Sequence, residues 1–468
     1  MTSSSAQDPP IADSSLYRRV WRWHFYAGLV CLPFLALMAA TGAVYLFKDE
    51  IEARVYAHLR TASTAASPAL DAETLIGRAL QARAGQPVRY IAPPEPGRSA
   101  EVGILTSEGI VGVYLDPATG QPLGELPDAL RLAEVVKGLH SLAIVGEWAN
   151  YGVEIVAGWA IVLVVSGLFL WWPRGRRDGV VTVRGRPAQR TWWRDVHAVT
   201  GALASAAILF LATTGMPWSA YWGQQFGRIT GELGVGLPKH LFGPGPDSSV
   251  PPATGGTRVP WVVSHAPVPR SAVPPSAHGG HAPAGASADP APPEAPSLSV
   301  NSAVQIFERL GLPGGTPIAL PKGPRGTYSA MLFPDDVRGQ RVVHLDRYTG
   351  AVLSDVGYRD YGAAGRVVEW GINIHTGVQF GWINQLAMLA ACLSIIALAV
   401  SAAVMWWKRR PRGRLAAPPR REGDRAAAGA IAIAAVLGLV FPLLGASMLV
   451  ALLVDRMMPR RWGERYGL

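Results

Sequence analysis

The sequence predicts a polytopic α-helical membrane protein: an internally duplicated four-helix core that carries two small α+β modules outside the membrane. Four long apolar stretches predict the core, and a content of 49% hydrophobic and 16% charged residues over 468 positions agrees with it. A histidine near one end of each stretch predicts the duplication. Two matching segments between the stretches predict the modules.

The four spans are the apolar stretches at about 24–47, 150–172, 198–221 and 381–407. Each is long enough to cross a hydrocarbon core of about 30 Å at about 1.5 Å per residue. The first stretch exceeds the apolar part of a cleavable signal peptide, which has about 7–15 residues. We therefore expect it to remain as an uncleaved membrane anchor.

Positive charge predicts the orientation, because short cytoplasmic loops keep an excess of Lys and Arg. Basic clusters lie before the first span, between the second and third spans, and after the fourth: Arg18, Arg19, Arg22, Arg174, Arg176, Arg177, Arg184, Arg186, Arg190, Arg194, Lys408, Arg409, Arg410, Arg412 and Arg414. We expect a multi-pass protein of a bacterial inner membrane with a cytoplasmic N-terminus and with periplasmic loops at 48–135 and 222–370. This topology and contact with membrane lipid account for the net charge of +10, which requires no nucleic acid.

The C-terminal apolar segment, 427–454, leaves two topologies open. As one straight helix it would carry the arginines that follow it to the periplasmic side, against the charge rule. A break at Pro442 and Gly445 would instead form a hairpin that returns to the cytoplasm, although each half would be short. The charge rule favours the break.

The four histidines near the span ends are His24, His140, His197 and His375. The offset from His24 to His197 is 197 − 24 = 173 residues, and the offset from His140 to His375 is 375 − 140 = 235. A low-complexity segment at roughly 240–300 accounts for the difference, so the two halves align without it. Each outer histidine precedes its next Trp pair by 31 residues (171 − 140 = 406 − 375 = 31), or about 46 Å if the helix is unbroken.

Histidines repeated at membrane boundaries predict metal or haem binding, because ionisable groups in spans are costly and usually functional. Two imidazoles from facing helices commonly hold a haem iron. His24 and His197 enter from the cytoplasmic side and His140 and His375 lie on the periplasmic side, so we expect one pair at each side. A single boundary histidine is more often an interfacial anchor, and that alternative stays open.

Glycines near the histidines have two interpretations. Gly28 and Gly201 follow the inner histidines by four residues, and Gly146 and Gly381 follow the outer histidines by six. They either leave room for a flat macrocycle or let the helices pack closely. Both interpretations can hold together.

The two modules share one pattern. Each begins with an amphipathic stretch, 71–84 or 301–310, and ends with a strand that leads into Asp-x-x-Thr-Gly, at 116–120 and 346–350. In such a turn the Asp side chain bonds its own backbone and the Gly supplies a positive φ. We expect two small structural α+β folds.

The insert is too polar and too rich in Pro and Gly to bury a core, so we expect disorder from about 243 to 297. It contains His265, His278 and His281. The last two flank a Gly-Gly pair that could weakly bind a transition metal, but a linker without function is the stronger interpretation.

Other cofactor motifs are missing from the sequence. The two cysteines, Cys31 and Cys392, fall inside spans and lack metal-site spacing. There is no C-x-x-C-H for covalent haem and no G-x-G-x-x-G after a strand for NAD or flavin. Any reductant must therefore be an unidentified cytoplasmic protein or a membrane quinol.

Five motifs resemble the PepSY-associated transmembrane family, which includes iron-regulated inner-membrane proteins and ferric-siderophore reductases. They are Tyr17-Arg-Arg-Val-Trp-Arg-Trp-His24-Phe-Tyr-Ala-Gly28, Leu139-His140-Ser141-Leu142, Trp193-Arg-Asp-Val-His197, Thr214-Gly215-Met216-Pro217-Trp218 and His375-Thr376-Gly377. The resemblance covers nearly the whole chain outside the insert, and both outer modules look like periplasmic PepSY domains.

The resemblance implies a membrane b-type cytochrome that passes electrons outward to a ferric siderophore or another ferric chelate, for iron acquisition. Its cofactor would be haem b, with two haems expected and one left open. Cytoplasmic-side ligands would be His24 and His197, and periplasmic-side ligands His140 and His375. The alternative is a non-enzymatic PepSY protein that restrains a peptidase or senses the state of the envelope.

Two surfaces are candidates for contact with the chelate, one just after the third span and one on the second module. They comprise Trp218, Tyr221, Trp222 and Gln224 on the first, and Arg338, Arg341 and His344 on the second. Interfacial anchoring and ordinary solvation of a strand face are the respective alternatives.

These predictions divide the chain into cytoplasmic, membrane and periplasmic segments. In order they are the N-terminus 1–23, helix 24–47, first module 48–135, outer histidine and second helix 136–172, basic loop 173–193, third helix 194–222, insert segment 223–300, second module 301–370, outer histidine and fourth helix 371–407, basic loop 408–426 and C-terminal membrane segment 427–454.

Overall fold

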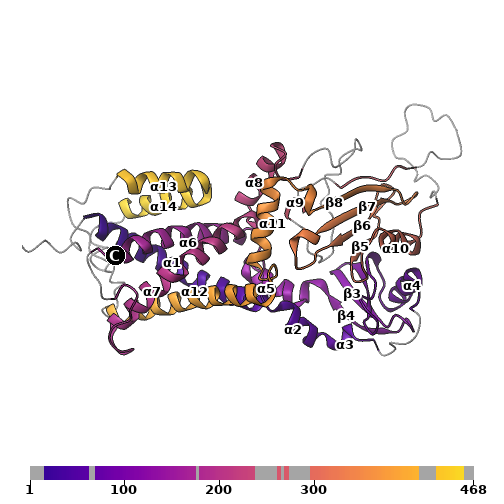
Figure 1. Ribbon diagram of the computed structural model, residues 1–468, viewed down its shortest axis with the longest axis horizontal. Coiled ribbons are helices and arrows are strands. Elements are labelled where there is room, and N and C mark those ends of the chain that lie inside the picture. Colours follow the sequence, from indigo (N-terminus) through magenta and orange to yellow (C-terminus); the bar gives the residue numbers. More distant parts are fainter. Residues whose placement is uncertain are drawn as a thin grey trace, which may run out of the picture.

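The structure is a computed structural model that describes residues 15–62, 69–174, 179–237, 261–264, 268–273, 296–410 and 428–457. Long helices form one end of the molecule and an antiparallel sheet forms the other (Figure 1). Four helices are long and apolar enough to cross a membrane: α1 (Ser15–Tyr45), α6 (Ala149–Trp171), α7 (Arg190–Gly215) and α12 (Gly381–Arg409). The predicted membrane protein with four spans is confirmed.

The four long helices form a bundle in which α1 and α7 each pack against both α6 and α12. The helices α1 and α7 therefore occupy opposite corners. Both begin earlier than the apolar pattern predicts, because the helical backbone continues through the basic residues that precede each apolar stretch. His24 and His197 thus lie inside these helices, as predicted, with about two turns of helix before each of them.

Two shorter helices enter the bundle from the sheet side, α5 (Leu132–His140) before α6 and α11 (Ala363–His375) before α12. The expectation of an unbroken helix from each outer histidine is wrong. Leu142 (φ 57°) and Gly377 (φ 82°) lie in the turns after the two helices, in a backbone region that a right-handed helix cannot pass through. Each outer histidine thus ends its own helix, and α11 crosses the end of the bundle (Figure 1).

The two predicted modules form a single sheet. Its strands are β1 (Gln86–Ile91), β2 (Ala100–Thr106), β3 (Gly109–Leu115), β4 (Pro122–Pro127), β5 (Pro317–Ala319), β6 (Thr327–Leu332), β7 (Arg341–Asp346) and β8 (Val352–Gly357). All neighbours are antiparallel, in the order β4-β3-β2-β1-β5-β6-β7-β8. Tyr90 of β1 pairs with Ile318 of β5, so each half covers an otherwise open edge of the other.

One hydrophobic core serves both halves of the sheet. The helices α4 (Ala72–Ala82) and α10 (Val300–Arg309) pack against each other, and Leu75 of α4 and Phe307 of α10 lie in one cluster with strand residues. Ser299 caps α10, rather than a residue at the predicted start, 301. The joint sheet and its shared core make the predicted modules one folding unit.

The two Asp-x-x-Thr-Gly turns form as predicted. Asp116 accepts hydrogen bonds from the backbone N–H groups two and three residues on, and Asp346 does the same. Gly120 and Gly350 both have a φ of 72°, which favours glycine.

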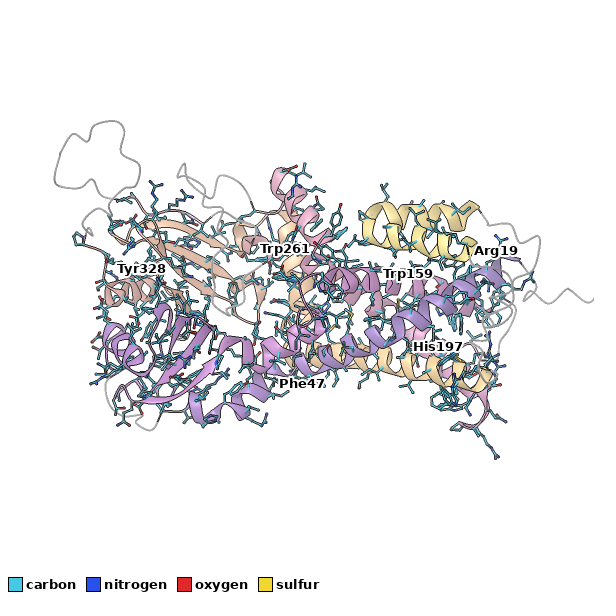
Figure 2. The ribbon with its side chains drawn as sticks, turned by 180° about the vertical axis from the view of Figure 1, so that it is seen from behind. Arg19, Phe47, Trp159, His197, Trp261 and Tyr328 are labelled. Atoms are coloured by element: carbon cyan, nitrogen blue, oxygen red, sulfur yellow. The ribbon has the colours of Figure 1, made fainter. Side chains whose placement is uncertain are left out.

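Two short stretches of the predicted insert belong to the fold. Trp261, in α9 (Trp261–Ser264), is 2% exposed, and its indole N–H donates to the carbonyl of Pro217 at 2.7 Å (Figure 2). Ser271 is also buried. The expectation that the whole stretch 243–297 lies outside the fold is therefore wrong. His265, His278 and His281 lie outside the described residues.

The C-terminal membrane segment contains a break. Helices α13 (Ala428–Val440) and α14 (Pro442–Met457) meet at Phe441 and pack against each other. A Cβ added at Gly438 would lie 3.0 Å from the Cα of Gly445, so the two backbones are in close contact. The segment is a helical hairpin that packs on α6 through α14.

Candidate functional site: two histidine pairs

The end of the bundle remote from the sheet, here called the inner end, brings His24 and His197 together. Their ring centroids lie 6.4 Å apart, with planes at 86°. His24 Nδ1 lies 2.8 Å from Ser166 Oγ of α6, and His197 Nδ1 lies 3.0 Å from Ser401 Oγ of α12. The inner site therefore takes one residue from each of the four spans; Figure 2 shows His197 among them.

The outer end, next to the sheet, brings together His140 and His375. His140 Nδ1 lies 3.0 Å from Thr41 Oγ1 of α1, and His375 Nδ1 lies 2.8 Å from Thr214 Oγ1 of α7. Burial first, and the neighbouring His140 ring second, lower the pKa of His375 to about 4. The outer site repeats the inner contact pattern with threonine in place of serine.

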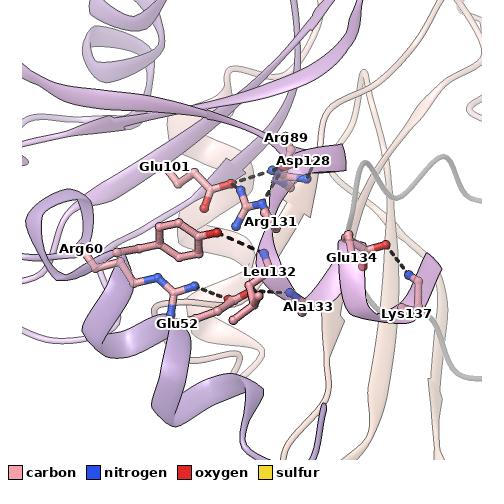
Figure 3. A network of polar contacts seen from close by, with 11 residues as sticks. Glu52, Arg60, Arg89, Glu101, Asp128, Arg131, Leu132, Ala133, Glu134 and Lys137 are labelled. Carbon is pink, nitrogen blue, oxygen red and sulfur yellow. Dashed lines mark hydrogen bonds and ion pairs between the residues drawn. The ribbon is translucent and has the colours of Figure 1, made fainter. Parts of the chain in front are cut away.

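Contacts outside the membrane hold α5, and with it His140. Glu52 of α2 (Lys48–Val55) accepts a hydrogen bond from the backbone N–H of Ala133, in the first turn of α5 (Figure 3). The hydroxyl of Tyr56 accepts a second hydrogen bond, from the backbone N–H of Leu132. These two groups satisfy N–H donors that a helix start leaves without intrahelical partners.

A buried charge network joins the sheet to the start of α5. Arg89 of β1 and Arg131, which precedes α5, each pair with both Glu101 and Asp128 at 2.6–2.8 Å (Figure 3). Each buried carboxylate thus faces two guanidinium groups, as buried charges require. The position of α5 is therefore linked to the sheet.

Different contacts hold α11, and with it His375. The backbone N–H groups of Gly362 and Ala364 donate to carbonyls of residues 236 and 235, which follow α8 (Trp222–Glu232). Glu369 accepts from the backbone N–H of Val262 in α9 at 3.1 Å. The α8–α9 region thus holds the start of α11 in place, as α2 holds the start of α5.

Three glycines leave room beside the imidazoles, and each follows a hydroxyl residue in sequence. An added Cβ would lie 3.7 Å from His140 Cε1 at Gly42, 3.2 Å from His24 Cε1 at Gly167 and 3.6 Å from His375 Cε1 at Gly215. The fourth hydroxyl residue, Ser401, is followed by Ala402 and not by a glycine. A Ser/Thr-Gly dipeptide inside a span narrows the candidates but does not identify the site residues, because Thr200-Gly201 has the same pattern.

The glycines singled out from the sequence have other roles. A Cβ added at Gly28 or Gly201 would lie 3.8 or 3.5 Å from a leucine of the adjacent span, so these two allow close helix packing. Gly146 and Gly381 have positive φ angles; Gly146 lies between α5 and α6, and Gly381 is the first residue of α12. The room beside the imidazole rings is instead provided by Gly42, Gly167 and Gly215 on the facing helices.

The spacing of the site residues is the same in both halves. A histidine and a hydroxyl residue are 17 positions apart in α1 (41 − 24) and in α7 (214 − 197). The outer histidine and the inner serine are 26 positions apart in both halves (166 − 140 and 401 − 375). Because 17 residues of helix span about 25 Å, the two sites are separated along the bundle by nearly the thickness of a hydrocarbon core, which is about 30 Å.

The inner pair has the separation that a shared metal ion requires. Two imidazoles that bind one ion from opposite sides have ring centres about 6 Å apart, because a metal–nitrogen bond is about 2 Å and the ring centre lies about 1 Å further. The observed distance is 6.4 Å. Within the described ranges, no group of three or more His, Cys, Asp or Glu side chains could hold a metal ion, so the paired imidazoles are the metal-binding candidates.

The candidate residues on the second half of the sheet do not form one exposed surface. Arg338 pairs with Asp336 and Arg341 with Asp355, both at 2.6 Å, so carboxylates of the same half neutralise both charges. His344 is 2% exposed and its Nδ1 lies 2.8 Å from a serine hydroxyl of β6. Burial lowers the pKa of His344 to about 4, and the side chain is a core residue instead of a surface contact.

The candidates after the third span remain partly accessible. Trp218 is 48% exposed and Tyr221 is 37% exposed. Trp222 stacks on Phe226 and donates from its indole N–H to the carbonyl of Val440, which ties it to the C-terminal hairpin. Gln224 is exposed as well, so Trp218, Tyr221 and Gln224 are the candidates placed to meet a ligand.

Comparison with known protein families gives one match: the family described as PepSY-associated TM region matches residues 21–409. The matched range includes α1 from Trp21 on, the other three spans, the whole sheet and both histidine pairs. No curated protein sequence matches the chain.

Proposed function

The chain belongs to the family of PepSY-associated TM regions, and we propose that it is a b-type haem protein of the bacterial inner membrane that moves electrons outward to reduce a ferric chelate. One observation carries the proposal: the bundle holds a histidine pair near each end, and the inner imidazoles are 6.4 Å apart. Two such pairs, about 25 Å apart along the helices, provide a site at each membrane face.

The residues present fit haem b at both sites. His24 and His197 would bind one iron, and His140 and His375 the other. Iron held by two imidazoles has no open position and supports one-electron transfer rather than oxygen chemistry. The hydroxyl groups orient the rings, and Gly42, Gly167 and Gly215 keep the space beside them free.

One feature supports the proposed orientation of the chain in the membrane, and another supports its internal duplication. The basic ends of the spans, which include Arg19, lie at the opposite end of the molecule from the sheet (Figure 2), so a cytoplasmic inner end and a periplasmic sheet satisfy the charge rule. The equal spacings of 17 and 26 residues in the two halves support an internal duplication with two PepSY-like periplasmic modules.

The proposed reaction needs one electron for each ferric ion. A cytoplasmic protein or a membrane quinol supplies the electron at the inner site, and Fe(III) of a siderophore or other chelate accepts it outside and becomes Fe(II). Hard oxygen ligands hold the larger, less charged Fe(II) more weakly, so the chelate releases its metal. Trp218, Tyr221 and Gln224 are the exposed candidates for contact with the chelate.

Anaerobic reoxidation tests the proposal. Protein purified in detergent and reduced with dithionite should be reoxidised by a ferric hydroxamate, whereas the gallium(III) complex of the same chelator, which cannot accept an electron, should have no effect. His375→Ala should abolish the reaction while the inner site still reduces. If no ferric chelate reoxidises the protein faster than buffer, the reductase function is wrong and a regulatory PepSY protein takes its place.

A further inference from the structure

Four hydroxyl residues touch the imidazoles without lying in the proposed iron coordination. Building on the function above, we propose that Thr41, Ser166, Thr214 and Ser401 are positioning residues that accept the Nδ1–H of the four histidines and so leave each Nε2 free to bind iron. We further propose that both sites are asymmetric. In each pair, among the described residues, one histidine (His24 or His375) has only the hydroxyl as hydrogen-bond acceptor, whereas the other (His197 or His140) also has a backbone carbonyl.

The hydroxyl groups are set up to accept. Each donates its own hydrogen to a backbone carbonyl of its helix at 2.6–3.0 Å: Thr41 to Leu37, Ser166 to Val162, Thr214 to Phe210 and Ser401 to Leu398. A hydroxyl has one hydrogen and two lone pairs, so a hydroxyl that donates to a carbonyl meets the imidazole with a lone pair. The nitrogen facing it, Nδ1, then carries the hydrogen.

His197 provides independent support for this tautomer. Its Nδ1 lies 3.2 Å from the carbonyl oxygen of Leu398, in addition to its serine. A carbonyl oxygen can only accept, so Nδ1 is protonated and Nε2 holds the free lone pair. The backbone of Met38 is likewise a second hydrogen-bond partner of the His140 ring.

The same contacts create the asymmetry. Within the part of the chain that the structure describes, a single hydroxyl is the hydrogen-bond partner of Nδ1 in His24 and in His375. If the hydroxyl is removed, His140 and His197 keep a carbonyl acceptor, whereas His24 and His375 lose their acceptor. Ser166 and Thr214 should therefore matter more than Ser401 and Thr41.

The effect on iron follows from the basicity of the ligand. An acceptor on Nδ1–H makes the imidazole a stronger donor to the metal and fixes its orientation, and loss of such a partner typically costs about 10- to 100-fold in metal affinity. A stronger donor favours Fe(III) over Fe(II). Loss of the acceptor should thus raise the midpoint potential of the affected site, by about 59 mV if Fe(III) binding falls tenfold more than Fe(II) binding.

Thr214 offers the cleanest test, because its neighbour is a matched control. Thr214→Val keeps the methyl group that packs near Gly371 and removes only the hydroxyl. Thr213 lies in the same helix, is exposed, and also donates its hydroxyl hydrogen to a backbone carbonyl. Thr213→Val and Thr214→Ser are therefore the control and the conservative rescue.

Haem content and midpoint potential are measured by spectroscopic redox titration of the purified full chain. We expect Thr214→Val and Ser166→Ala to raise the potential of the outer and inner component respectively, Thr41→Val and Ser401→Ala to shift theirs less, and the control and rescue variants to match wild type. Loss of the outer haem in Thr214→Val but not in Thr214→Ser would also support the proposal.

Three results would overturn the positioning role. One is a wild-type potential in haem-loaded Thr214→Val and Ser166→Ala, which leaves the haem function standing. Another is an equal shift in Thr213→Val or in Thr214→Ser. The third is a wild-type protein without haem, which removes the proposed function together with this inference.

Discussion

The inner and outer histidine pairs both contact hydroxyl side chains of the spans, but different parts of the molecule hold the two pairs in place. His24 and His197 lie within spans, so the bundle alone fixes the inner pair. His140 and His375 end short helices, whose starts are held by groups outside the membrane-spanning helices. The inner site should therefore withstand damage to the sheet, whereas the outer site should follow the state of the sheet.

Loss of a histidine should have the largest effect and should separate the sites completely. We expect His24→Ala to remove the inner haem and His375→Ala to remove the outer haem, each leaving roughly half of the pigment, because each iron then has one protein ligand. Absorbance per chain in membranes measures this, with exposed His58→Ala as the control. Full pigment in both variants would rule out ligation by these residues.

Trp261 tests whether the outer site depends on packing outside the bundle. Removing its buried side chain should cost about 3–5 kcal/mol, as for other buried aromatic residues, and should weaken the outer haem before the inner one. Trp261→Phe keeps most of the volume but leaves the buried carbonyl of Pro217 without this donor, so it should cost about 1–3 kcal/mol. Thermal unfolding followed at both haems gives the comparison. Equal loss at both sites would contradict the separate supports.

Glu52 tests the link between α2 and the start of α5. In Glu52→Ala the backbone N–H of Ala133 loses its partner, at a cost of about 1–3 kcal/mol. We expect broadening or loss of the outer haem signal in electron paramagnetic resonance, while the inner signal stays unchanged. Glu134, which pairs with Lys137 on the surface of the same helix, provides the control variant Glu134→Ala. A change of the inner signal alone would reverse our assignment.

Gly167 tests the inner site in turn and should have the smallest effect. A methyl group there would lie 3.2 Å from His24 Cε1, so the ring must move by a few tenths of an ångström. Overpacking of this kind costs about 1–3 kcal/mol. We expect Gly167→Ala to shift the inner midpoint potential and to leave the outer one unchanged. Gly152→Ala in the same helix meets nothing within 4 Å and should behave like wild type.

The four spans could be predicted from the sequence because hydropathy and length are local properties. The pairing of the histidines by membrane side followed from the topology. The Ser/Thr-Gly positions could not be predicted in the same way, since Thr41 and His140 are 99 residues apart and meet only when α5 turns into the bundle.

In the sheet and in the stretch around Trp261, tertiary contacts that the sequence pattern did not predict determine the fold. The two modules were predicted as separate folds, but the pairing of β1 with β5 joins them through a contact between residues more than 200 positions apart. Trp261 lies in a stretch whose composition indicates disorder, yet its buried side chain and its hydrogen bond to Pro217, together with the bond from Val262 to Glu369, place this stretch in the fold.

We propose that the bundle holds two irons, one at each end, each bound between two imidazoles. The most direct test is haem per chain in the purified wild-type protein, together with its electron paramagnetic resonance spectrum. We predict two haems per chain, both low-spin, and two one-electron steps on redox titration. A chain that binds no haem, or that binds only high-spin haem, would contradict the account.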